Sequence, residues 1–198
     1  MNTHAGSSGQ GSGLGPLLWS GEHWIAYLRE GGERGTEGRA GASISLYHAY
    51  DSPAGEGTVA FVATDALTAV CTDNPALAEF ARDRLVIRRV SPIDPDAEIL
   101  EASLTRVGEV RRTPGWRIEA ADHVIAAEWA ELGAAIVGPT TASPSICFTI
   151  LYFAAEGAIA VDGEPMPGRA YPRDAWTKTL GRPMSSFCFA LSETMLDT

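Results

Sequence analysis

The residues best suited to acid–base or ligand-binding chemistry lie in the segment from Tyr47 to Asp51. Alternate side chains of a β-strand point to opposite faces, so His48 and Tyr50 should share one face and Tyr47 should point to the other. A histidine titrates near neutral pH and can accept, donate or transfer a proton. We therefore predict His48 and Tyr50 as catalytic residues within a cavity. In the alternative interpretation, both lie half-exposed at a strand end and bond to backbone groups.

His123 is the third candidate catalytic residue. It follows Asp122 directly, but adjacent residues of a strand face opposite sides, so Asp122 cannot easily orient the imidazole. An acid–base role for His123 therefore requires a carboxylate from another part of the fold. The alternative is that His123 has no chemical role.

Metal and nucleophile signatures are missing from the sequence. The four histidines show no i, i+2 or i, i+4 pair, and there is no C-x-x-C, H-E-x-x-H or G-x-S-x-G motif. His48, Asp51 and His123 form a metal site only if the fold brings them together, so we predict no metal and no cofactor. Each of the three cysteines lies in an apolar stretch, which favours packing over a disulfide framework or a reactive thiolate. They are Cys71, Cys147 and Cys188.

Five tryptophans supply large flat surfaces whose indole N–H groups can orient a bound polar group. Trp116 and Trp129 lie on consecutive predicted strands, with an alternation that can aim both rings inward. We predict them as ligand-binding residues in a pocket wall, together with Tyr47. The alternative, that these aromatic rings only fill the core, stays open.

Most of the chain consists of strand signals separated by turns. Alternating or continuous apolar runs predict strands at 44–50, 58–64, 67–72, 100–105, 116–120, 146–153, 158–161 and 185–192. Glu164 begins a short return strand after the Asp162-Gly163 turn. Asn74 and Pro75 supply a cap and a first helical position for the segment through Leu85, which predicts a helix.

In two segments the apolar residues fit both the periodicity of a helix and that of a strand. Residues 17–30 place Trp24, Tyr27 and Leu28 at helical spacing, although Trp24, Ala26 and Leu28 also alternate; we predict a short helix there. Residues 122–132 have cap residues at both ends, but their hairpin neighbours favour a strand.

The 198-residue chain fits a single domain over 17–198, preceded by a flexible Gly/Ser-rich tail at 1–16. Its formal charge of −10 argues against nucleic-acid and acidic-membrane partners. No apolar run is long enough for a membrane-spanning helix, and no basic segment precedes an apolar one at the N-terminus. We therefore expect a cytoplasmic protein.

About ten strands and one clear helix predict a mainly β fold, an antiparallel β-barrel or sandwich with one or two short helices. This architecture resembles that of calycin-like barrels such as lipocalins, which often begin with a glycine and a tryptophan separated by one residue; here two residues separate Gly21 from Trp24. The likeness is in architecture alone and carries over no site residue.

Three functions follow from this reading. The sequence predicts a barrel that binds a small, partly apolar molecule. The alternative is a small-molecule enzyme, of isomerase, cyclase or hydrolase type, that uses His48 with Tyr50 or His123 with a carboxylate. The third reading is self-association through a sheet edge or an apolar patch, which would make a homo-oligomer.

Overall fold

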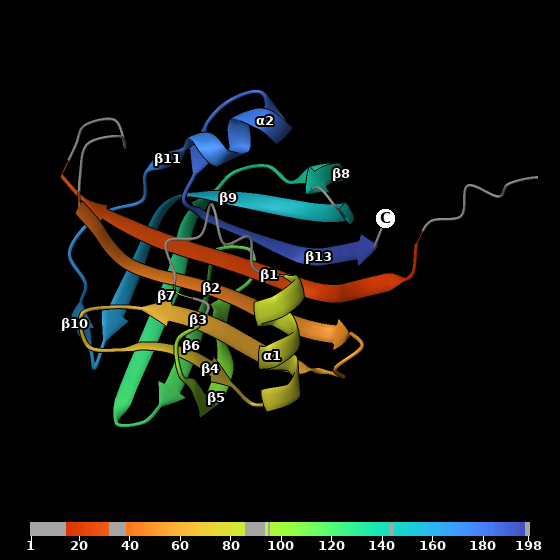
Figure 1. Cartoon of the computed structure of the whole chain (residues 1–198). Helices are drawn as coiled ribbons and strands as arrows, with labels where there is room; N and C mark the ends of the chain where they lie inside the picture. Colours follow the sequence, from red (N-terminus) through yellow and green to blue (C-terminus); the bar gives the residue numbers. More distant parts are fainter. Residues whose placement is uncertain (1–14, 32–38, 86–93, 95, 143–144, 197–198) are drawn as a thin grey trace, which may run out of the picture.

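A nine-stranded closed β-barrel forms the body of the protein (Figure 1). The computed structural model describes residues 15–31, 39–85, 94, 96–142 and 145–196. Around the barrel the strand order is β9-β13-β1-β2-β3-β4-β5-β6-β7, and β7 pairs with β9 to close the sheet. These strands are β1 (Leu17–Glu30), β2 (Arg39–Asp51), β3 (Gly57–Ala63), β4 (Thr68–Thr72), β5 (Ile99–Glu109), β6 (Thr113–Ala120), β7 (His123–Leu132), β9 (Ser145–Val161) and β13 (Phe187–Leu196). The predicted antiparallel barrel is confirmed.

The remaining elements extend or cover the barrel. β8 (Ile136–Ala142) pairs with the first part of β9, and β10 (Glu164–Pro165) pairs with its last part. β11 (Pro172–Arg173) and β12 (Met184–Ser185) form a separate two-stranded sheet, with the 3-10 turn η1 (Asp174–Trp176) and the short helix α2 (Thr177–Leu180) between them.

Helix α1 (Pro75–Arg84) forms where the sequence predicts it. Asn74 caps it, because its side-chain oxygen accepts a hydrogen bond from the Leu77 N–H at 3.2 Å, and Pro75 begins the first turn. The helix buries Leu77, Ala78 and Ala81 against the outside of the barrel. The connection from β4 to β5 contains α1, and it is a crossover that allows β5 to run parallel to β4. Every other pairing around the barrel is antiparallel.

The prediction of a helix over residues 17–30 is wrong, because this segment is β1. Both faces of β1 are buried: Trp24, Ala26 and Leu28 point into the barrel, while Ile25 and Tyr27 pack in a second apolar layer outside it. A strand covered on both faces is apolar at nearly every position, so its period cannot be told from that of a helix. The prediction of a strand over 122–132 is confirmed by β7.

The middle of the barrel is filled by aromatic rings. Trp24 stacks on Phe189 with ring centroids 4.2 Å apart and meets Trp129 edge-on at 5.0 Å. The ring of Phe187 lies over Gly157 on the neighbouring strand, where any side chain would collide with it. β9 is one continuous strand through this glycine rather than the two predicted strands.

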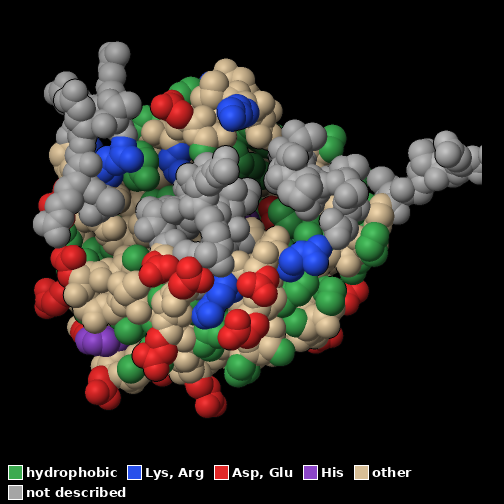
Figure 2. Space-filling view, in the orientation of Figure 1, with side chains coloured by type: hydrophobic (Ala, Val, Ile, Leu, Met, Phe, Trp, Pro, Cys, Tyr) green, Lys and Arg blue, Asp and Glu red, His purple; other side chains and the backbone are tan. Residues whose placement is uncertain are grey.

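The other expectations concern the chain ends and the surface. Apart from residues 15 and 16, the predicted tail at 1–16 lies outside the described residues, so its flexibility stays a prediction. Within the described residues, no helix combines the length and the apolar character needed to cross a membrane. Figure 2 shows Asp and Glu side chains gathered over the lower part of one face.

Candidate functional site

Three of the predicted site residues meet at one end of the barrel. His48 and Tyr50 lie near the end of β2, and Trp116 projects inward from β6 on the other side of the interior. The His48 ring centroid is 5.2 Å from that of Tyr50 and 5.6 Å from that of Trp116. Closure of the barrel therefore brings together two strands that do not pair with each other.

Glu22 is the centre of this end, and the sequence analysis did not single it out. Its carboxylate is 2% exposed and accepts hydrogen bonds from the Trp24 indole N–H, at 2.9 Å, from the Tyr50 hydroxyl and from the Arg106 guanidinium. Buried carboxylates require such partners, because an unpaired charge in the interior is very costly. Together with the rings described above, these side chains form a group that we call the barrel-end cluster. Its members are Glu22, Trp24, His48, Tyr50, Arg106 and Trp116.

Arg106 holds its place by stacking as well as by its ion pair. Its guanidinium lies over the Trp24 and Trp116 rings, 5.6 Å and 5.5 Å from their centroids. Such cation–π contacts favour arginine, whose planar head is weakly hydrated. The side chain remains 33% exposed, so solvent reaches part of Arg106.

A sequence signal for both charged residues existed. Glu22 alternates with Trp24 and Ala26, and Arg106 continues the inward alternation of Ala102 and Leu104 on β5. A charged residue at a strand position whose side chain points into the core is unusual, and it indicates a paired or functional group. Because residues 17–30 were predicted as a helix, the strand alternation that points Glu22 inward was not recognised.

Tyr50 is a hydrogen-bond donor in this cluster. Its pKa is raised to about 12 by partial burial first, and then by its hydrogen bond to Glu22 and the charge of that carboxylate, against an opposing effect of Arg106. The phenol therefore stays protonated at neutral pH and cannot serve as a general base there.

His48 is oriented by a hydroxyl group. Its Nδ1 lies 2.9 Å from Thr58 Oγ1, and Thr58 is 2% exposed, so the hydroxyl is fixed on β3. Thr58 can donate to or accept from the ring, depending on the tautomer. A histidine held by one nitrogen and packed beside Trp116 can offer the rest of its ring to a bound molecule.

Trp116 carries an unpartnered donor. Its ring is 3% exposed, and its buried indole nitrogen has no hydrogen-bond partner among the described residues. Most buried polar groups are paired, and leaving one unpaired costs roughly 1–3 kcal/mol. The barrel-end cluster thus contains an N–H group that lacks an acceptor.

The two other predicted ligand-binding residues lie outside this cluster. Trp129 is fully buried in the middle of the barrel and donates its indole N–H to the Ile25 carbonyl at 2.9 Å. Tyr47 points to the outer face, as the alternation predicts, and stacks on His23 at 4.2 Å. Burial raises the pKa of Tyr47, with a smaller contribution from Glu193, so its hydroxyl stays protonated.

His123 has a carboxylate partner, but not beside His48. Its Nδ1 lies 2.8 Å from Asp162 Oδ2 on the surface, where the two side chains are 31% and 48% exposed. The Val124 backbone N–H and, to a smaller extent, His123 hold the pKa of Asp162 below its usual value. His123 pairs with Ala120, four residues along β6 from Trp116, so the structure does not join the two histidines in one site.

The cysteines remain dispersed, as do the residues considered for a metal site. Cys71, Cys147 and Cys188 are buried and form no disulfide with one another, and burial raises the pKa of the Cys71 thiol to about 11 and that of Cys188 to about 12. In the part of the chain that the structure describes, no three His, Cys, Asp or Glu side chains come close enough together to hold a metal ion.

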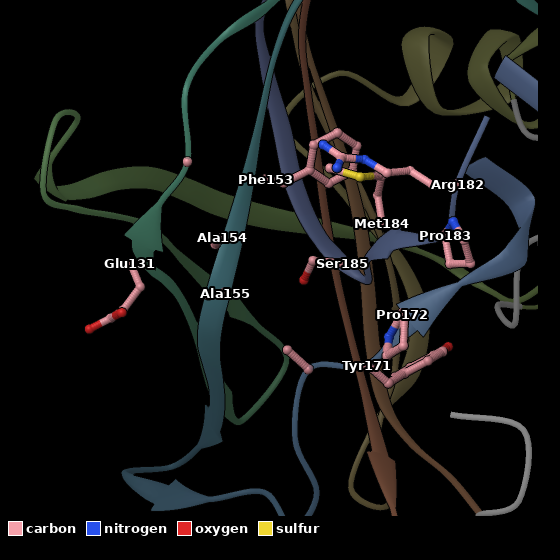
Figure 3. A pocket seen from close by; sticks show the side chains of 12 residues that line it. Glu131, Phe153, Ala154, Ala155, Tyr171, Pro172, Arg182, Pro183, Met184 and Ser185 are labelled. Carbon is pink, nitrogen blue, oxygen red and sulfur yellow. The ribbon is translucent and has the colours of Figure 1, made fainter. Parts of the chain in front are cut away.

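A cleft of about 450 Å³ lies on the outside of the barrel (Figure 3). β9 forms its floor with Phe153, Ala154 and Ala155, and the segments around β11 and β12 form the opposite wall with Pro172 and Met184. Its lining is mostly apolar, and none of the predicted site residues contributes to it. Sequence reasoning missed this cleft because its walls come from segments far apart in the chain.

Comparison with known proteins assigns no family to the chain. No protein-family model, curated protein or solved structure matches it.

Proposed function

We propose that this protein binds a small, partly apolar molecule through a hydrogen-bond-accepting oxygen at the barrel-end cluster. The observation that carries the proposal is the unpartnered indole N–H of Trp116, beside the ring of His48 and the guanidinium of Arg106. All three can donate to a carbonyl or carboxylate oxygen. The surrounding rings supply apolar contact area for the rest of the molecule.

The roles within the cluster differ. Glu22 holds Arg106 and Tyr50 in position, so it is a positioning residue rather than a ligand contact. Trp116 and Arg106 donate to the ligand oxygen, and His48 adds a third polar contact from β2. The partial exposure of Arg106 and Tyr50 provides access from solvent at this end of the barrel.

Calorimetric titration with small probes tests the proposal. Benzoate and benzamide offer an acceptor oxygen, whereas toluene has the same ring without one. We expect the two acceptors to bind and toluene to bind at least tenfold more weakly, because a hydrogen bond to a charged or buried donor is worth about 1.5–3 kcal/mol.

Three variants complete this test. Trp116→Phe keeps a ring but removes the N–H, and Arg106→Gln removes the charge; each should weaken acceptor binding several-fold. Arg117→Gln is the matched control, since this arginine is 47% exposed and its side chain lies on the opposite face of β6 from Trp116. Equal affinities for all three variants, or no binding by the wild type, would refute the proposal.

The oriented imidazole of His48 keeps an acid–base enzyme as the second candidate. Loss of turnover in His48→Ala with ligand affinity retained would favour the enzyme. Reduced affinity without any turnover in the wild type would favour a binding protein.

A further inference from the structure

An exposed apolar surface lies at the same end of the barrel as the cluster. Among the described residues, four large apolar or aromatic side chains are exposed: Tyr50 at 48%, Val137 at 73%, Phe148 at 45% and Ile150 at 37%. Tyr50 belongs to the barrel-end cluster. The other three lie on the paired strands β8 and β9, and we call them the apolar shelf.

The shelf continues the inner face of the barrel. Phe148 and Ile150 alternate with the buried Cys147 and Thr149, so they share a face with Tyr152, which stacks on the interior ring of Phe189 at 5.3 Å. Val137 lies directly opposite Ile150, and such cross-strand pairs lie on one face of a sheet.

The same face leads from the shelf to the barrel-end cluster. Phe148 pairs with Thr194 on β13, and Thr194 pairs with Ser20 on β1, with the two hydroxyl oxygens 3.2 Å apart. Ser20 precedes Glu22 by two residues, so both side chains lie on this face. Adjacent strands are about 4.8 Å apart, which puts Phe148 and Glu22 roughly 10–15 Å apart. Figure 1 shows β1, β9 and β13 running together toward this end.

We propose that the ligand is a single-chain amphiphile whose oxygen-bearing head binds at the barrel-end cluster and whose hydrocarbon tail lies on the apolar shelf. This inference rests on the proposed function and adds the chemical class of the ligand. The head is a carboxylate or a neutral carbonyl, since both accept hydrogen bonds from Trp116 and Arg106.

Size and charge favour a tail over a macromolecular partner on the shelf. A stable protein interface buries about 800 Å² on each partner, far more than three side chains supply. The net charge of −10 also opposes association with a second copy or with an anionic membrane. A free amphiphile needs only the small area that the shelf offers.

The test is a chain-length series measured by calorimetry below the micellar concentration. Butyrate, hexanoate, octanoate and decanoate share one head, and decanamide and decyltrimethylammonium change it. We expect affinity to rise by up to about fourfold for each methylene that becomes buried, as about 0.8 kcal/mol per methylene implies. Decanamide binding as well as decanoate would identify a neutral carbonyl head, and decyltrimethylammonium should bind far more weakly than either.

Phe148→Ser and Ile150→Ser should flatten the chain-length dependence while leaving butyrate affinity unchanged. Both side chains are exposed, so the variants should fold, which their melting temperatures check. Val124→Ser, a half-buried valine at the start of β7, is the control and should keep the wild-type slope.

The outcomes separate the two proposals. If butyrate and benzoate bind but longer chains gain nothing, or if the shelf variants keep the wild-type slope, the tail assignment is wrong and the proposed function stands. If no probe binds, both are wrong. If Val137→Ser lowers the molecular mass in sedimentation equilibrium, the shelf contacts a second copy and the tail assignment is wrong.

Discussion

Replacing Glu22 tests whether the barrel end is organised around its carboxylate. Glu22→Gln keeps the size of the side chain but offers one acceptor oxygen, and places an amide N–H₂ group against donors from Trp24, Tyr50 and Arg106. Trp24 and Arg106 share one carboxylate oxygen, which the amide oxygen can replace, and the amide N–H₂ group then faces the Tyr50 hydroxyl, which has to accept instead of donate. We therefore assign the loss to the missing negative charge beside Arg106 and to the hydrogen bond that Tyr50 no longer donates, about 1–3 kcal/mol in all.

Urea unfolding, followed by far-UV circular dichroism, measures this loss as a lower midpoint at constant slope. Glu119→Gln is the matched control. That glutamate pairs with Arg117 at 2.7 Å, but the side chains are 51% and 47% exposed, and such surface pairs contribute about 0–1 kcal/mol. The double variant Glu22→Gln/Arg106→Gln should lose less than the sum of the single variants, because the two residues are in contact. A neutral Glu22→Gln variant, or strict additivity with Arg106→Gln, would refute this account of the cluster.

Three further predictions concern the core, the phenol and the thiols. Phe187→Ala should lower the free energy of unfolding by about 3–5 kcal/mol, against less than about 1 kcal/mol for the exposed Phe148→Ala; similar losses in urea unfolding would contradict the face assignment of Phe187. The pKa of Tyr50 is raised to about 12, so its contribution to stability is complete below the unfolded pKa near 10 and is lost as the pH rises through 12. Tyr50→Phe should therefore weaken the alkaline loss of stability and remove one late step from the ultraviolet phenolate titration; an unchanged titration would show that Tyr50 ionises normally. Cys71 and Cys188, with pKa values raised to about 11 and 12 by burial, should react with Ellman's reagent at neutral pH only after unfolding, and rapid reaction of the native protein would disprove this.

Local signals determined much of the fold. The cap at Asn74-Pro75 fixed helix α1, and alternating strands with tight turns fixed the hairpins of β2–β3 and β5–β6. In β5 and β6 exposed and buried positions alternate, so the pattern reveals the period of a strand. β3 is buried on both faces, but its short apolar run between turns is typical of a covered strand. In β1 both faces are buried, and the sequence alone could not separate helix from strand.

The candidate site depended on both sequence and tertiary structure. Residue type and alternation selected His48, Tyr50 and Trp116, and the same alternation placed Tyr47 on the opposite face. Only closure of the barrel could bring Arg106 from β5 to Glu22 on β1, because these strands are not neighbours in the sheet and 84 positions separate the residues. The alternation of residues within a strand determines which side chains share a face. Contacts across the barrel depend on strand order, tilt and stagger, which no single segment encodes.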